Sequence, residues 1–82
     1  MAHKNKVLSV TGRWKLVKSV NERGGVKYLI VHTGWSTARL SDIDQLFNPG
    51  GNRKVAAMSY TWKFNTRDEA EKLMTIAVLK GW

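Results

Sequence analysis

The chain has 82 residues with 43% hydrophobic content, which suffices for one small domain with a thin core and leaves no room for a second. Fourteen Lys and Arg residues against six Asp and Glu give a formal charge of +8, and the absence of cysteine excludes disulfides, thiolate zinc sites and cysteine nucleophiles. No apolar run exceeds four residues, whereas a bilayer span needs about 20, so we expect a cytoplasmic protein without a membrane segment or secretory signal.

The first predicted element is a half-buried strand over residues 8–16. Apolar and polar residues alternate there, with Leu8, Val10, Gly12, Trp14 and Leu16 on one side and Ser9, Thr11, Arg13 and Lys15 on the other. Alternation with period two indicates a strand, and its outer side is polar and basic. Residues 1–6 before it are expected to form a flexible basic terminus, and residues 7–82 a single compact domain.

A second strand follows a glycine-rich turn. Residues 21–25 read Asn-Glu-Arg-Gly-Gly, and Val26 to Thr33 are rich in strand-forming residues, so we expect a hairpin. The alternation is weaker in this strand, because Leu29 and Val31 are apolar on the side opposite to Ile30. A strand that is apolar on both sides is either covered twice or exposes a patch to a partner.

A short helix and a third strand are predicted next. Ser41 is expected to cap a helix that runs to residue 47, with Asp42 and Asp44 in its first turn. Its apolar stripe consists of Leu40, Ile43, Leu46 and Phe47. Residues 48–52 contain Pro and two Gly and form a loop, after which the alternation over 55–64 predicts a strand with Tyr60 and Trp62 on its inner side.

The last predicted element is a helix that begins after Thr66. Thr66 and Glu69 have the spacing of a capping box, and Gly81 is placed to end the helix. Its apolar stripe consists of Ala70, Leu73, Met74, Ala77 and Val78. The sequence therefore predicts an α+β domain with a small, mainly antiparallel sheet, element order β-β-α-β-α, and helices packed on one face.

Positive charge is concentrated in the first half of the chain. Residues 1–41 hold eight bases and one acid, Glu22, whereas residues 42–82 hold six bases and five acids. The five acids stand where helices are expected to begin, and the helix dipole favours them there. The surplus positive charge is therefore available to a partner rather than used in the fold.

Enzyme chemistry is not indicated by the sequence. His3 and His32 have no second histidine or carboxylate at metal-ligand spacing, and the acids are explained by helix starts. The glycine pairs at 24–25 and 50–51 match neither the phosphate-loop nor the dinucleotide fingerprint. We expect a protein that is not an enzyme, with no catalytic residues, metal or cofactor.

The leading hypothesis is a small, basic nucleic-acid-binding protein. Neutralising phosphates releases counterions, and aromatic rings stack on bases. The candidate residues are Arg13, Lys15, Arg23, Lys27, Arg53, Lys54 and Lys63 for phosphate and Trp35 for stacking. Because no recognition helix, zinc finger or RNA-recognition motif is present, we expect largely electrostatic, weakly sequence-specific binding to DNA or RNA.

The alternative is a protein-interaction module, such as an inhibitor or adaptor of the phage or mobile-element type, acting on a larger acidic protein. Tryptophan and arginine are favoured at interface hot spots. The candidate residues for this role are Leu29, Val31, Trp35 and Trp82. A homodimer through the same patch is compatible with either hypothesis.

Overall fold

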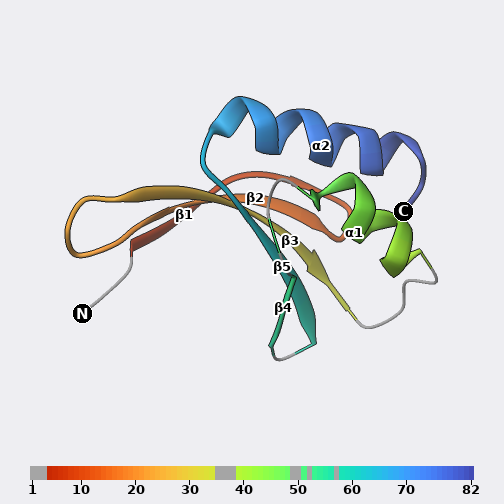
Figure 1. Ribbon diagram of the computed structural model, residues 1–82, viewed down its shortest axis with the longest axis horizontal. Helices are drawn as coiled ribbons and strands as arrows, with labels where there is room; N and C mark the ends of the chain where they lie inside the picture. Colours follow the sequence, from red (N-terminus) through yellow and green to blue (C-terminus); the bar gives the residue numbers. More distant parts are fainter. Residues whose placement is uncertain (1–3, 35–38, 49–50, 52, 57) are drawn as a thin grey trace.

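Five strands form one antiparallel sheet, and both helices lie on the same side of it (Figure 1). The computed structural model describes residues 4–34, 39–48, 51, 53–56 and 58–82. The elements are β1 (Lys4–Thr11), β2 (Trp14–Val20), β3 (Val26–Thr33), α1 (Leu40–Leu46), β4 (Lys54–Ala56), β5 (Ser59–Phe64) and α2 (Arg67–Leu79). The strand order is β1-β2-β3-β5-β4, so β1 and β4 form the edges.

The predicted order β-β-α-β-α is wrong, because the described chain runs β-β-β-α-β-β-α. The predicted strand over 8–16 is a hairpin that turns at Gly12 and Arg13, with Thr11 paired to Trp14. Gly12 has a φ of +59°, the conformation that favours glycine at the first central position of a type II′ turn. This turn shifts the alternation by one residue, so Val10 lies on the side opposite to Trp14 and not beside it as predicted.

The predicted strand over 55–64 is also a hairpin. β4 ends at Ala56, β5 begins at Ser59, and these two residues pair. Met58 has a φ of +66°, a left-handed conformation that residues with side chains rarely adopt. The chain turns here without the Gly, Asn or Pro that would mark a turn in the sequence.

The core lies between the sheet and the two helices. Inward residues of β2, β3 and β5 pack against both helices; the buried members are Trp14, Leu16, Ile30, Ile43, Phe47, Tyr60, Trp62, Phe64, Ala70, Met74 and Ala77. Phe47, directly after α1, contacts the rings of Trp14, Trp62 and Phe64 edge-on, at centroid distances of 5.8, 5.0 and 5.9 Å. Each such pair contributes about 0.5–1.5 kcal/mol beyond burial, so Phe47 holds the short helix on the sheet.

The start of α1 differs from the prediction. Its N-cap residue is Arg39, with no side-chain cap bond, so the predicted cap by Ser41 is wrong. Asp42 lies in the first turn, but Asp44 does not. The Asp44 carboxylate instead accepts a hydrogen bond of 3.0 Å from the indole Nε1 of Trp62, which is fully buried and needs an acceptor.

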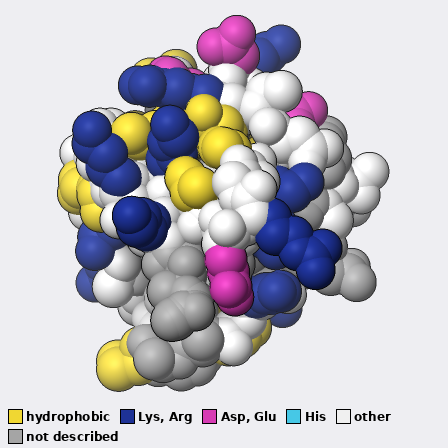
Figure 2. Space-filling model, turned by 90° about the vertical axis from the view of Figure 1, so that its left-hand side faces the viewer, with side chains coloured by type: hydrophobic (Ala, Val, Ile, Leu, Met, Phe, Trp, Pro, Cys, Tyr) yellow, Lys and Arg dark blue, Asp and Glu magenta, His cyan; other side chains and the backbone are white. Residues whose placement is uncertain are grey.

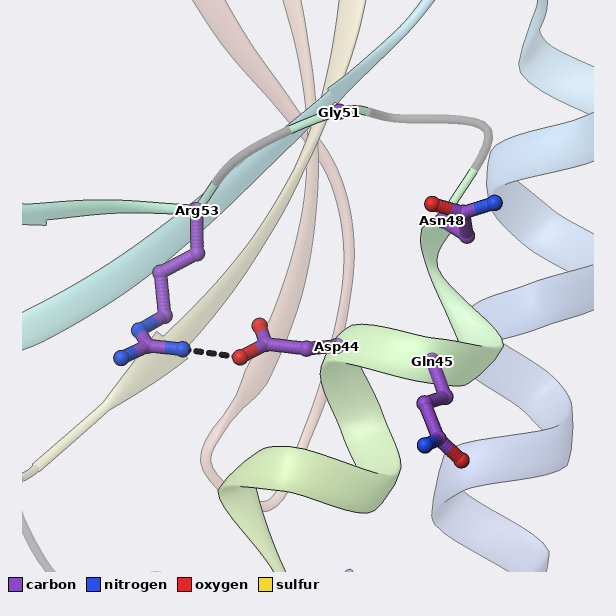
Figure 3. A pocket seen from close by; sticks show the side chains of 5 residues that line it. All are labelled: Asp44, Gln45, Asn48, Gly51 and Arg53. Carbon is purple, nitrogen blue, oxygen red and sulfur yellow. Dashed lines mark hydrogen bonds and ion pairs between the residues drawn. The ribbon is translucent and has the colours of Figure 1, made fainter.

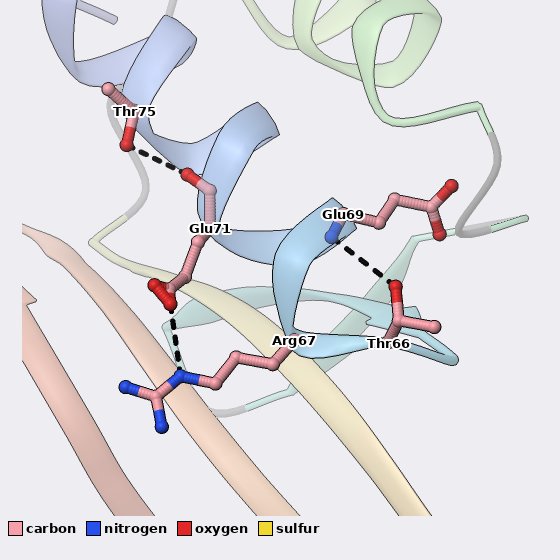
Figure 4. Close-up of polar contacts among 5 residues, drawn as sticks. All are labelled: Thr66, Arg67, Glu69, Glu71 and Thr75. Atoms are coloured by element: carbon pink, nitrogen blue, oxygen red, sulfur yellow. Dashed lines mark hydrogen bonds and ion pairs between the residues drawn. The ribbon is translucent and has the colours of Figure 1, made fainter.

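Both ends of α2 follow the sequence prediction. The Thr66 hydroxyl oxygen accepts a 3.3 Å hydrogen bond from the Glu69 backbone N–H, as an N-cap does (Figure 4). At the other end Gly81 has a φ of +76° and donates to the Val78 carbonyl, while Trp82 donates to the Ala77 carbonyl. These two bonds form a Schellman motif, which ends the helix at the predicted glycine.

Neither helix in the described part of the chain is long and apolar enough to cross a membrane. The division into a terminus over 1–6 and a domain over 7–82 stays a prediction; β1 already begins at Lys4.

Replacing the capping threonine tests this account of α2. We expect Thr66→Ala to lower the free energy of unfolding by about 1 kcal/mol, because the Glu69 amide loses its acceptor. Urea denaturation with an unchanged m value measures the loss. Thr75→Ala is the matched control, because the Thr75 hydroxyl donates to the Glu71 carbonyl inside the helix and does not cap its end (Figure 4). If Thr66→Ala and Thr75→Ala lower the free energy of unfolding equally, the Thr66 cap does not contribute to the stability of α2.

Candidate nucleic-acid interface

Charge separates the strands from the helices. The described strands carry seven lysines and no carboxylate: Lys4, Lys6, Lys15, Lys18, Lys27, Lys54 and Lys63. The two helices carry five of the six acids of the chain: Asp42, Asp44, Asp68, Glu69 and Glu71. The sheet is therefore the basic layer of the molecule, and the helices form the acidic layer.

Four of the predicted phosphate contacts share the side of the sheet that no helix covers, which we term the open face. Lys15 is paired with Val31 and therefore points away from the core side chain of Trp14. By the same register the open face contains Asn5, Val7, Val10, Lys15, Val17, Ser19, Lys27, Leu29, Val31, Thr33, Lys54, Ser59, Thr61 and Lys63. Lys27, Lys54 and Lys63 are exposed, and Lys15 is half-buried.

The centre of the open face is apolar. Val7, Val17 and Leu29 lie side by side across β1, β2 and β3, and Val10 and Val31 flank Lys15. Val17 is only 7% exposed although no helix covers it, which shows how closely its neighbours enclose it, whereas Val7 is 53% exposed. Figure 2 views the molecule from the side of the β2–β3 turn and shows Lys and Arg side chains beside hydrophobic ones at this end of the molecule.

The carboxylates of the helix layer are partly paired with arginines. Arg67 lies 3.0 Å from Glu71, and Arg39 lies 3.5 Å from Asp42. In the part of the chain that the structure describes, no ion pair involves an open-face lysine; Lys27 donates a hydrogen bond to the amide oxygen of Asn65. None of the ion pairs between described residues therefore neutralises the positive charge of the open face.

Arg53 lies on the helix side and not on the open face. Its guanidinium pairs with the Asp44 carboxylate and lies 5.6 Å from the centroid of the Tyr60 ring. Figure 3 shows this pair beside a cavity of about 550 Å³ that Gln45 and Asn48 also line. Asp44 also accepts a hydrogen bond from the indole of Trp62. The ion pair between Arg53 and Asp44 is therefore one of the polar contacts that attach α1 to the sheet.

The other predicted residues are dispersed. Arg13 lies in the β1–β2 turn and lines a cavity of about 250 Å³ with His32 and Trp82, while Arg23 lies in the β2–β3 turn. Trp35 lies outside the described residues. Leu29 and Val31 are on the open face, but Trp82 packs against the core, with the Lys80 ammonium 5.2 Å from its ring, so these three do not form one surface.

The sequence prediction missed the β1 part of the apolar centre. Val7 and Val10 face outward because the chain reverses at Gly12 and Arg13, and because the β1 register shifts between Val7 and Ser9. Glycine followed by one residue is the signature of a type II′ hairpin, so Gly12 was the available signal.

His32 is a buried member of the aromatic core. Its ring lies 4.6 Å from that of Trp14 in an edge contact, and it is 2% exposed. Burial lowers the pKa of His32 below its ordinary value of 6.5, and the positive charge of Arg13 lowers it further, against a backbone hydrogen bond with Gly34. Among the described residues no three His, Cys, Asp or Glu side chains gather as a metal site.

No protein-family model, curated protein or solved structure matches this chain. The function is therefore inferred from the charge and geometry of the open face.

The lowered pKa of His32 predicts a pH-dependent stability. In the unfolded chain His32 takes up a proton near pH 6.5, whereas in the folded protein it stays neutral to a lower pH. The free energy of unfolding is therefore at its full value above pH 6.5 and falls as the pH drops toward the pKa of His32 in the folded protein. The slope is at most about 1.4 kcal/mol per pH unit for one proton. Urea denaturation between about pH 7.5 and 5.5 measures it.

Two variants test whether His32 causes this pH dependence of the stability. His32→Phe keeps an aromatic ring and is expected to remove the slope, whereas His3→Gln, which removes the other histidine, keeps it. An NMR titration of the His32 imidazole in the wild-type protein measures its pKa directly, without a variant. A midpoint for His32 at or above 6.5 would contradict the account.

Proposed function

We propose that this is a small, basic, non-enzymatic nucleic-acid-binding protein of the cytoplasm, and that its binding surface is the open face. One observation carries the proposal: Lys15, Lys27, Lys54 and Lys63 share one face without a carboxylate, while the helices hold the acids on the other side. Phosphates that meet such a face release their counterions, which favours binding. The helices carry five acids against Arg67 and Lys72, so phosphate is attracted to them less than to the open face.

The residue types on this face support electrostatic binding with weak sequence preference. All four cations are lysines, which act as point charges, and the arginines that could form bidentate bonds to a base lie elsewhere in the described chain. Ser19 and Thr61 add hydroxyl groups that suit phosphate oxygens. The protein is therefore proposed to recognise the backbone of its ligand more than its bases.

A second candidate is protein binding through the apolar centre. Val7 and Val10 are 53% and 56% exposed beside Leu29, and the surrounding lysines complement an acidic surface. A larger acidic protein or a second copy of this chain could cover this patch. The two candidates differ in salt dependence, because apolar burial is screened far less than phosphate binding.

Binding to a labelled oligonucleotide, followed by fluorescence anisotropy at several salt concentrations, tests the proposal. Four lysines at about 0.9 counterions each predict that log affinity falls against log salt with a slope of about −3 to −4 for a duplex. We expect Lys63→Ala to reduce this slope by about 1. An affinity that does not depend on salt would contradict the proposal and favour the second candidate.

Lys72→Ala is the matched control for Lys63→Ala. Lys72 is exposed on α2, so the variant loses the same charge from the opposite side of the molecule. We expect its salt slope to equal that of the wild type. If Lys72→Ala weakens binding as much as Lys63→Ala, binding follows the net charge, and the open face is not the site.

A further inference from the structure

The aromatic side chains of the strands point away from the open face. The strand register places six aromatic residues on the helix side of the sheet: Trp14, Tyr28, His32, Tyr60, Trp62 and Phe64. Proteins that hold single-stranded nucleic acid use exposed aromatic rings on which successive bases stack. The open-face positions of the described strands carry no such ring, so unpaired bases find no stacking platform there.

Three lysines form a diagonal line across the open face. Lys54 on β4 is paired with Thr61 of β5, and Lys63 follows two residues after Thr61. Lys63 is paired with Leu29 of β3, and Lys27 lies two residues before Leu29. Each step of the line is a diagonal cross-strand neighbour, about 7–8 Å away. The line covers roughly 15 Å, which spans a few successive phosphates along one strand of B-form DNA.

The fourth lysine stands on the other side of the apolar centre. Lys15 is paired with Val31, and Leu29, the next outward residue of β3, is paired with Lys63. Strand spacing and residue rise place Lys15 and Lys63 on the order of 12 Å apart. The major groove of B-form DNA is about 12 Å wide, so cations at this spacing reach phosphates on both of its sides.

We propose that the ligand of the open face is double-stranded B-form DNA, bound across the major groove. This inference rests on the proposed function. The line of Lys54, Lys63 and Lys27 follows one phosphate strand, and Lys15 contacts the other. Leu29 and Val31 face the groove between them, where apolar side chains contact thymine methyl groups. A-form RNA has a deep and narrow major groove that side chains cannot enter, so it does not fit this arrangement.

The test compares three labelled probes of one sequence: a DNA duplex of about 20 base pairs, one of its strands, and the matching RNA duplex. At about 100 mM salt, we expect the DNA duplex to bind at least about ten-fold more tightly than either of the others, as measured by anisotropy. Equal affinity for the single strand or the RNA duplex would overturn the duplex DNA assignment and leave the proposed function standing. Absence of binding to all three would overturn the proposed function itself.

Two variants separate the groove contact from the phosphate contacts. We expect Leu29→Thr to weaken duplex binding several-fold without changing its salt slope, because no cation is lost. Leu79→Thr, on an 81% exposed residue of α2, is the matched control and leaves binding unchanged. Lys15→Ala is expected to lower the salt slope for the duplex by about 1 and to leave that for the single strand unchanged.

Three results would contradict the groove assignment. Unchanged duplex binding in Leu29→Thr, or an unchanged duplex slope in Lys15→Ala, would show that the two sides of the apolar centre do not act together. Sedimentation that shows a dimer of the wild type, lost in Leu29→Thr, would assign the apolar centre to a second copy of this chain.

Discussion

The structure depends on packing aromatic side chains on a single side of the sheet. Trp14 comes from β2, Trp62 and Phe64 come from β5, and Phe47 at the end of α1 contacts all three rings. The Asp44 carboxylate secures the same helix by accepting from the Trp62 indole. Two helices suffice to cover this side, and no described helix remains for the other. The open face is thus a consequence of where the rings lie.

The layers of charge follow from the same arrangement. Acids are stabilising near helix starts, as Asp68 and Glu69 are in α2, and others are held by arginines on the helix side. The strands keep their lysines without carboxylates to balance them, and Lys6 and Lys18 even lie directly opposite each other. Like charges at that distance destabilise a sheet. By register this pair lies on the side of Tyr28 and not on the open face, so its repulsion is separate from the charge of the proposed binding surface.

The sequence predicted the elements whose limits are set by local chemistry. Thr66 and Gly81 delimit α2 because capping bonds form within a few residues of each other. The strand over Val26–Thr33 was also predicted with its observed limits. Within single strands, alternation correctly separated Trp14 and Leu16 from Lys15.

The two missed hairpins have different physical causes. A two-residue turn shifts the alternation by one position, so a pattern that continues through the turn reads as one long strand. At Gly12 the glycine was a usable signal, whereas at Met58 the left-handed backbone depends on the pairing of β4 with β5, which no local pattern reveals. The same limit applies to the site. The alternation along each strand predicts that Lys15 and Lys63 face outward, but which residues lie beside them depends on strand register. The ion pair between Arg53 and Asp44 depends on how α1 packs against the sheet.

The most direct test of the central claim is an NMR map of backbone amide shifts as a DNA duplex is added to the protein. Binding on the open face predicts shifts that concentrate in β2, β3, β4 and β5 around Lys15, Lys27, Lys54 and Lys63, with the outer surface of α2 around Lys72 unmoved. Shifts confined to α2, or to the cavity between Arg13 and Trp82, would place the ligand on the helix side and contradict the account.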